Sequence, residues 1–140
     1  MEIDEEELSK RLLEIEYIRR ELENYINALN ALQMTQESLS RSLVGLSAVK
    51  NKSEILIPYS PDIFFSGILT DASSALVNIG SNVFKKLPFA GLKTRLENDL
   101  KEVDKNVAQI AQIIQKLQEE GSRLEREANE LYSHYGTGIR

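Results

Sequence analysis

The chain has 140 residues, a formal net charge of −5 and no cysteine or tryptophan, a composition that fits a single soluble domain. Without cysteine there is no disulfide framework and no thiolate metal site, and the lone His134 is too little for a catalytic triad or a two-histidine metal face. The acidic balance disfavours a protein that coats nucleic acid, and no apolar run reaches the roughly 18 residues of a membrane span. We therefore expect a cytoplasmic protein that is not an enzyme, with no cofactor, no metal, and neither nucleic acid nor membrane as a partner.

The first 44 residues contain neither glycine nor proline and carry a heptad repeat. With Leu8 at position a, ten of the twelve a and d positions through Leu46 are apolar, the exceptions being Arg11 and Gln36. Charged residues fill the positions between them. The pattern predicts a long amphipathic helix over residues 3–50 that pairs with another helix.

The middle segment, residues 54–87, reads as two β-hairpins. Four short apolar runs, at residues 55–58, 63–69, 75–79 and 83–87, are separated by turn signals. Two small hairpins expose unpaired strand edges and have more apolar side chains than they can bury alone. We therefore expect this segment to pack against other subunits in an oligomer. The side chains predicted to form that oligomer interface are Ile55, Ile57, Phe64, Phe65, Ile68, Leu69, Leu76, Val77, Ile79, Val83 and Phe84.

The last segment repeats the heptad pattern. From Leu96 to Tyr135, eleven of the twelve positions in a 4-3 alternation suit an apolar seam, and only Gly121 does not. A second helix is predicted over residues 90–135, followed by a flexible tail at 136–140. The expected fold is mainly α with a small β insert: a long antiparallel two-helix coiled coil with two β-hairpins at the end distal to the termini.

This layout resembles an archaeal prefoldin α-class subunit over nearly the whole chain. The sequence resemblance lies in residues 54–83: an apolar strand ending in Pro58, a small-residue strand that leads to Asp71, and a third strand that ends in the turn at Gly80. The second hairpin points to the α class, since β-class subunits carry one. The resemblance implies a single prefoldin-like domain, and a hexamer of two α-class and four β-class subunits joined through a β-barrel platform. It also implies an ATP-independent holdase that binds unfolded clients and delivers them to a group II chaperonin.

Apolar residues near both ends of the chain are the candidates for client binding. Residues 1–16 hold seven acids and two bases, so these apolar side chains lie among negative charges that would keep them soluble. Leu8, Ile15 and Leu131 also fit the seam, which is the simpler explanation for them. The full predicted set is Ile3, Leu8, Leu12, Leu13, Ile15, Leu131, Tyr132, Tyr135 and Ile139.

Three questions stay open at this level. The same module could assemble into a filament or another structural homo-oligomer, with a second copy of the chain as partner. It could also serve as a coiled-coil adaptor in a different complex. Lys85 and Lys86, at the fourth strand, are either a solvated strand end or a contact for an acidic partner.

Overall fold

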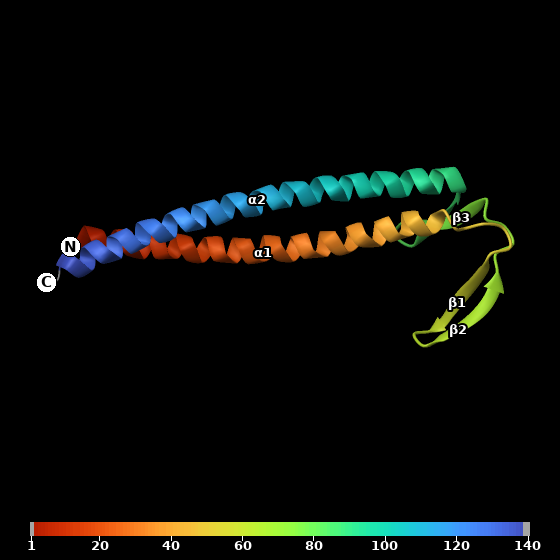
Figure 1. The fold of residues 1–140 in the computed structure, drawn as a ribbon, viewed down its shortest axis with the longest axis horizontal. Helices are drawn as coiled ribbons and strands as arrows, with labels where there is room; N and C mark the ends of the chain where they lie inside the picture. The colour runs from red at the N-terminus through yellow and green to blue at the C-terminus, as the bar shows by residue number, and fades with distance from the viewer. Residues whose placement is uncertain (1, 139–140) are drawn as a thin grey trace. The chain divides into compact units, whose positions relative to one another are not determined.

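The computed structural model describes the backbone of residues 2–138 and the side chains of residues 5–134. The elements in chain order are α1 (Glu2–Leu46), β1 (Glu54–Ser60), β2 (Ile63–Ile68), β3 (Ser74–Gly80), β4 (Val83–Pro88) and α2 (Phe89–Gly138), as Figure 1 shows. The chain divides into two compact units: a helical unit of residues 1–34 and 104–140, and a hairpin unit of residues 35–103. The predicted fold of two long helices and two β-hairpins is confirmed.

In the helical unit, the two helices pair in antiparallel orientation through the predicted seam. Arg11 near the start of α1 forms an ion pair with Glu127 near the end of α2, and Arg19 forms one with Glu125. The hydrophobic core beside these ion pairs is a cluster of four buried residues, with three partly buried leucines packed against them. These are Ile15, Ile18, Leu124 and Ala128, then Leu8, Leu22 and Leu117.

Gly121 is the one position of the second heptad pattern that has no apolar side chain, and it lies against Ile18. A Cβ atom at Gly121 would meet Ile18 Cγ2 at 3.4 Å, which is ordinary van der Waals contact. Gly121 lies three residues before Leu124, which is only 1% exposed, and the seam there has room for the Cβ of an alanine.

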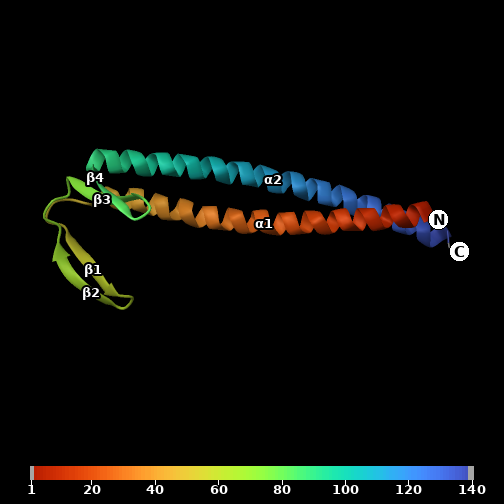
Figure 2. The same cartoon turned by 180° about the vertical axis from the view of Figure 1, so that it is seen from behind.

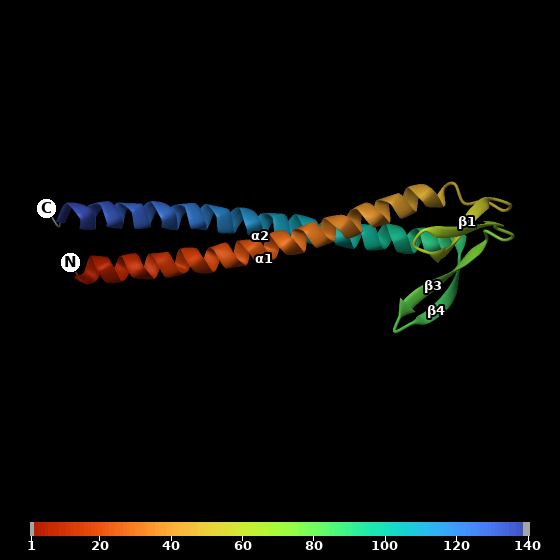
Figure 3. The same ribbon diagram turned by 90° about the horizontal axis from the view of Figure 1, so that it is seen from below.

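In the hairpin unit, the four strands form two separate two-stranded antiparallel sheets, β1–β2 (hairpin 1) and β3–β4 (hairpin 2). Figure 2 shows the two hairpins from behind, and Figure 3 shows β3 and β4 side by side. Pro61 and Asp62 form the two-residue turn of hairpin 1, where proline is favoured. The turn of hairpin 2 has positive φ at Ser81 (49°) and Asn82 (59°), as a type I′ turn requires.

The element boundaries differ from the predictions at several places, most at the ends of the two helices. α1 ends at Leu46 rather than near residue 50, because the backbone closes there in i→i+3 bonds, such as Ala48 N–H to the Gly45 carbonyl at 3.0 Å. β2 ends at Ile68, so Leu69 lies just outside the strand. α2 continues to Gly138, so the predicted tail is wrong for residues 136–138, where no proline stops the helix; residues 139–140 lie outside the described part.

Neither helix, over the residues the structure describes, contains a stretch apolar and long enough to cross a membrane.

Candidate functional site

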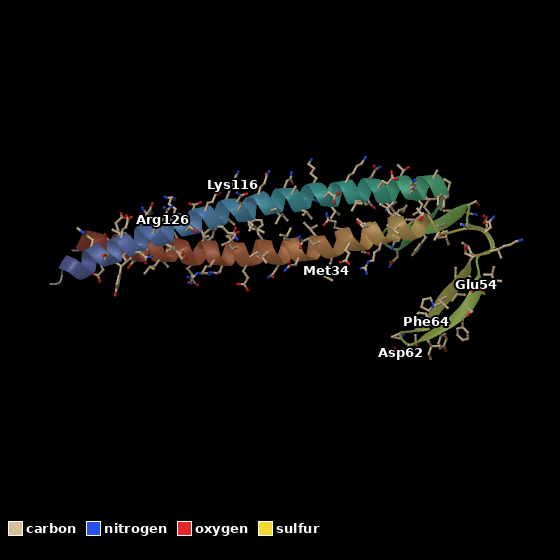
Figure 4. The ribbon with its side chains drawn as sticks, viewed as in Figure 1. Met34, Glu54, Asp62, Phe64, Lys116 and Arg126 are labelled. Atoms are coloured by element: carbon tan, nitrogen blue, oxygen red, sulfur yellow. The ribbon has the colours of Figure 1, made fainter. Side chains whose placement is uncertain are left out.

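Hairpin 1 exposes large apolar side chains on both of its faces. Residues paired across two strands share a face, so Ile57 and Phe65 lie on one face, and Leu56 and Ser66 on the other. Phe65 is 57% exposed and Leu56 is 67% exposed, although both belong to the same small sheet. Figure 4 shows Phe64 on this hairpin, with Asp62 at its turn and Glu54 at its other end. A sheet with two uncovered apolar faces is built to be covered by other chains.

The apolar set of hairpin 1 is larger than the sequence predicted. Tyr59 has no partner in the ladder, where the register shifts between Pro58 and Ser60, and its ring packs edge-on against Phe65 at 5.6 Å between centroids. The exposed large apolar residues of the hairpin are Ile55, Leu56, Ile57, Tyr59, Ile63, Phe64, Phe65 and Ile68. Leu56, Tyr59 and Ile63 were missed, although their place in strands of apolar residues would have identified them.

Hairpin 2 repeats the register of hairpin 1 at an offset of twenty residues. Glu54 pairs with Ile68 as Ser74 pairs with Pro88, and both ladders shift register at equivalent places, after Pro58 and after Asn78. The side chains differ more than the backbones. The positions of Phe65 and Ser66 in hairpin 1 are taken by Lys85 and Lys86 in hairpin 2.

Hairpin 2 is also better covered on one of its faces. Ala75, Val77 and Leu87 share that face and are half-buried, whereas Leu76 and Phe84 on the other face are exposed. Arg95 of α2 lies near this hairpin, with Nη2 3.5 Å from the backbone oxygen of Asn78. Of the eleven predicted interface residues, Leu69 and Val77 are partly buried, and the other nine are exposed, from 38% for Ile55 to 70% for Leu76.

The loop between the hairpins is fixed by polar contacts. The side-chain oxygen of Asn51 accepts a hydrogen bond from Ala72 N–H at 2.7 Å. Asp71 accepts bonds from the hydroxyl and the backbone N–H of Ser73, and these bonds, the hydroxyl first, lower the pKa of the Asp71 carboxyl below its ordinary value of 3.8. These bonds give the linker a defined conformation.

The helical unit also exposes large apolar side chains outside its core. Leu12, Leu13, Tyr17 and Tyr132 are all more than half exposed there. Leu13 and Tyr17 are one helical turn apart and border a groove of about 380 Å³. Its other lining residues are Lys10, Glu14, Ile18, Leu117, Glu120 and Leu124. The groove therefore combines an apolar floor with a charged rim.

The structure divides the residues predicted for client binding into three groups. Leu12, Leu13 and Tyr132 are exposed. Leu8 and Leu131 are half-buried in the seam, and Ile15 is a correction, since at 8% exposed it belongs to the core and has no free surface to offer. The side chains of Ile3, Tyr135 and Ile139 lie outside the described residues. Tyr17 was missed, because its c position in the heptad reads as part of a solvated helix face.

A cluster of charged side chains interrupts the seam at Arg11. Arg11 occupies a d position, and its guanidinium lies near three carboxylates: Glu127 at 3.0 Å, Glu14 at 3.3 Å and Glu7 at 3.9 Å. The Arg11 Nε and Glu127 Oε2 atoms are buried, and their N–H is not aligned for a hydrogen bond, so the contact is an ion pair. Glu127 also receives Arg123 at 3.0 Å. Over the described residues, no cluster of acidic and histidine side chains is arranged to hold a metal ion.

Comparison with known families identifies the family to which this architecture belongs. Residues 5–134 match the prefoldin family, described as prefoldin subunit. The chain belongs to the prefoldin family. Prefoldins are chaperone subunits that assemble with other prefoldin subunits, which agrees with the exposed hairpins of this prefoldin chain.

Two relatives place the chain more closely. It is 24% identical over 129 residues to the prefoldin subunit alpha of Pyrococcus horikoshii, a match that covers 89% of this chain and 87% of the relative. The resemblance to an archaeal α-class subunit is thereby confirmed. Among solved structures, a filamentous prefoldin from Methanocaldococcus jannaschii has a similar fold, with a TM-score of 0.50 and 17% identity over 87% of this chain and 98% of that one.

Proposed function

We propose that this prefoldin chain is the α-type subunit of a cytoplasmic, ATP-independent holdase, a hexamer of two α-type and four β-class subunits. The hexamer would bind unfolded polypeptides through the exposed apolar residues of its helical unit and pass them to a group II chaperonin. The observation that supports assembly is hairpin 1, whose apolar side chains are uncovered on both faces. A monomer would leave this surface in water, at a cost of roughly 25 cal/mol for each Å² of apolar area.

The client-binding part of the proposal rests on the surface around Leu13 and Tyr17. Unfolded chains present scattered apolar side chains, and a binder without sequence preference needs accessible apolar groups kept soluble by nearby charge. Leu13 is 70% exposed and lies beside Lys10 and Glu14 at the groove. Each such contact is weak, and several copies of the surface acting on one client would supply avidity.

The test measures assembly and client binding separately. Co-purification from the source cell followed by native mass spectrometry should give a hexamer that contains this chain and a β-class partner. Long homopolymers of this chain alone, seen by electron microscopy, would instead support a structural filament. Binding to one folded partner without activity on unfolded clients would support an adaptor.

Client binding is then tested with the assembled hexamer and a protein that aggregates on dilution from denaturant. The variant Leu13→Ser/Tyr17→Ser should suppress aggregation less than the unchanged hexamer. A matched control removes apolar groups that are equally exposed elsewhere, Met34→Ser/Val44→Ser, at 73% and 74% exposed. Figure 4 shows Met34 on the outer side of α1, pointing away from α2. Equal losses in both variants would contradict a specific role for the groove.

A further inference from the structure

The two hairpins share one backbone register, so a difference between them at equivalent positions is informative. The largest difference is the pair Lys85–Lys86 in β4, where hairpin 1 has Phe65 and Ser66. Consecutive residues of a strand point to opposite faces, so Lys85 shares a face with Val77, and Lys86 shares the other face with Leu76. Both lysines are exposed.

β4 is an edge strand on the side away from β3, since its sheet has only two strands. Its outward backbone groups are therefore open to a further strand, while the two lysines decide which strand is acceptable. Neither ammonium group lies within 4.0 Å of a carboxylate among the described residues. The pKa of the Asp71 carboxyl is lowered by two hydrogen bonds from Ser73 and also by the charge of Lys86, so the carboxylate that interacts electrostatically with Lys86 already accepts two bonds.

A second copy of this chain is a poor occupant for this edge. If two β4 strands paired in antiparallel orientation about their midpoint, Lys85 of each chain would lie opposite Lys86 of the other. Shifting the register by one residue in either direction would place Lys85 or Lys86 opposite itself. Every such register gathers four ammonium groups within cross-strand distance, which is destabilising.

The other strands of a second copy do not remove the conflict. Glu54 is the only acidic residue in the four strands. A single carboxylate can pair with a lysine on only one face of a sheet, whereas Lys85 and Lys86 lie on opposite faces. Neutralising both requires carboxylates at two consecutive positions of the incoming strand.

We propose that the outer edge of β4 binds an extended strand of a different chain that carries two consecutive acidic residues, and that Lys85 and Lys86 exclude a second copy of this chain from the same edge. The proposal rests on the proposed assembly through the hairpins and specifies one of its contacts. Self-contact of the chain in a larger assembly would then use other edges, such as those of hairpin 1.

The first test uses three fluorescent twelve-residue peptides of alternating threonine and valine with a central Glu-Glu, Gln-Gln or Lys-Lys pair. Anisotropy titrations with the chain of residues 1–140 should show the Glu-Glu peptide binding about fivefold more tightly than the Gln-Gln peptide, from two opposite-charge cross-strand pairs. The preference should disappear in Lys85→Gln/Lys86→Gln. It should persist in Lys50→Gln/Lys52→Gln, which removes the same charge from outside the strands.

Three results would overturn the proposal. One is no preference between the Glu-Glu and Gln-Gln peptides, including no binding of either at about 1 mM. The second is a preference that survives in Lys85→Gln/Lys86→Gln. The third is an equal loss in Lys50→Gln/Lys52→Gln, which would indicate general attraction to positive charge. Aggregation suppression does not enter this measurement, so the proposed chaperone function and this contact fail independently.

The second test addresses exclusion of the second copy. The chain has no cysteine, so Lys93→Cys supplies a unique exposed site for donor and acceptor dyes. Mixing the unchanged chain with Lys85→Glu/Lys86→Glu should raise energy transfer well above that of the unchanged chain alone, because lysines now face glutamates. Equal transfer in both samples would show that the lysines do not exclude self-pairing.

Discussion

Leu124 and Leu13 allow the same chemical change to be made in the core and on the candidate client surface. Both are leucines of the helical unit and both line the groove, but Leu124 is 1% exposed and Leu13 is 70% exposed. Replacing either by alanine removes three carbon atoms. At about 0.8 kcal/mol for each buried carbon, plus a cavity term, Leu124→Ala should cost about 3 kcal/mol of stability. Leu13→Ala should cost less than about 0.5 kcal/mol.

Hydrogen exchange of backbone amides measures this locally within the assembled protein. A loss of about 3 kcal/mol should accelerate exchange through residues 15–18 and 121–128 by about a hundredfold in Leu124→Ala. Leu13→Ala should leave exchange nearly unchanged and still reduce the suppression of client aggregation. Comparable exchange in the two variants would refute the assignment of Leu124 to the core and of Leu13 to the surface.

Three further predictions concern single positions. Gly121→Ala should slow exchange by about fivefold, because alanine gains about 1 kcal/mol of helix propensity and its Cβ meets Ile18 at an ordinary contact distance; faster exchange would mean that the closer approach matters more. Arg11→Leu should lower the melting temperature, since it removes one partner of a partly buried ion pair and leaves the carboxylates of Glu127, Glu14 and Glu7 without this cation; an unchanged or higher value would show that the apolar packing of the leucine outweighs the lost ion pairs. Ser73→Ala should raise the pKa of Asp71 part-way towards 3.8 in an NMR titration, since the backbone N–H bond remains. Because this pKa is lowered in the folded chain, its stabilisation is present above about pH 4 and lost as pH falls through the folded value.

The helical seam was predictable because it repeats many times. Each apolar heptad position is separate evidence for the same apolar stripe along the helix. Polar exceptions such as Arg11 and Gln36 therefore did not obscure the pattern. Ile18 and Leu124 were placed in the seam by this pattern, and both are buried. The end of α1 was less predictable, because no proline follows Leu46 closely and Gly45 lies within the helix.

The hairpins were predictable as elements but not in register. The turns identify where each hairpin reverses, whereas the register shifts at Tyr59 and Ile79 depend on how the backbone pairs across the turn. Without them, the equivalence of Phe65 with Lys85 is invisible in the sequence. Tyr17 was missed for a similar reason, since only the position of the neighbouring helix shows that a c position borders a groove.

The two tight turns have a consequence for the order in which the chain folds. Each hairpin joins residues close in sequence, and such hairpins form within about 1–10 μs. Arg11 and Glu127, by contrast, lie more than a hundred residues apart in the chain, so their encounter carries a large loop-closure entropy. Hairpins formed early, with the short linker held by Asn51, shorten the effective loop that joins α1 to α2. We then expect α1 and α2 to pair first at the residues nearest the hairpins in the chain and last near the termini. The contacts around Leu8 and Leu131 should therefore form last.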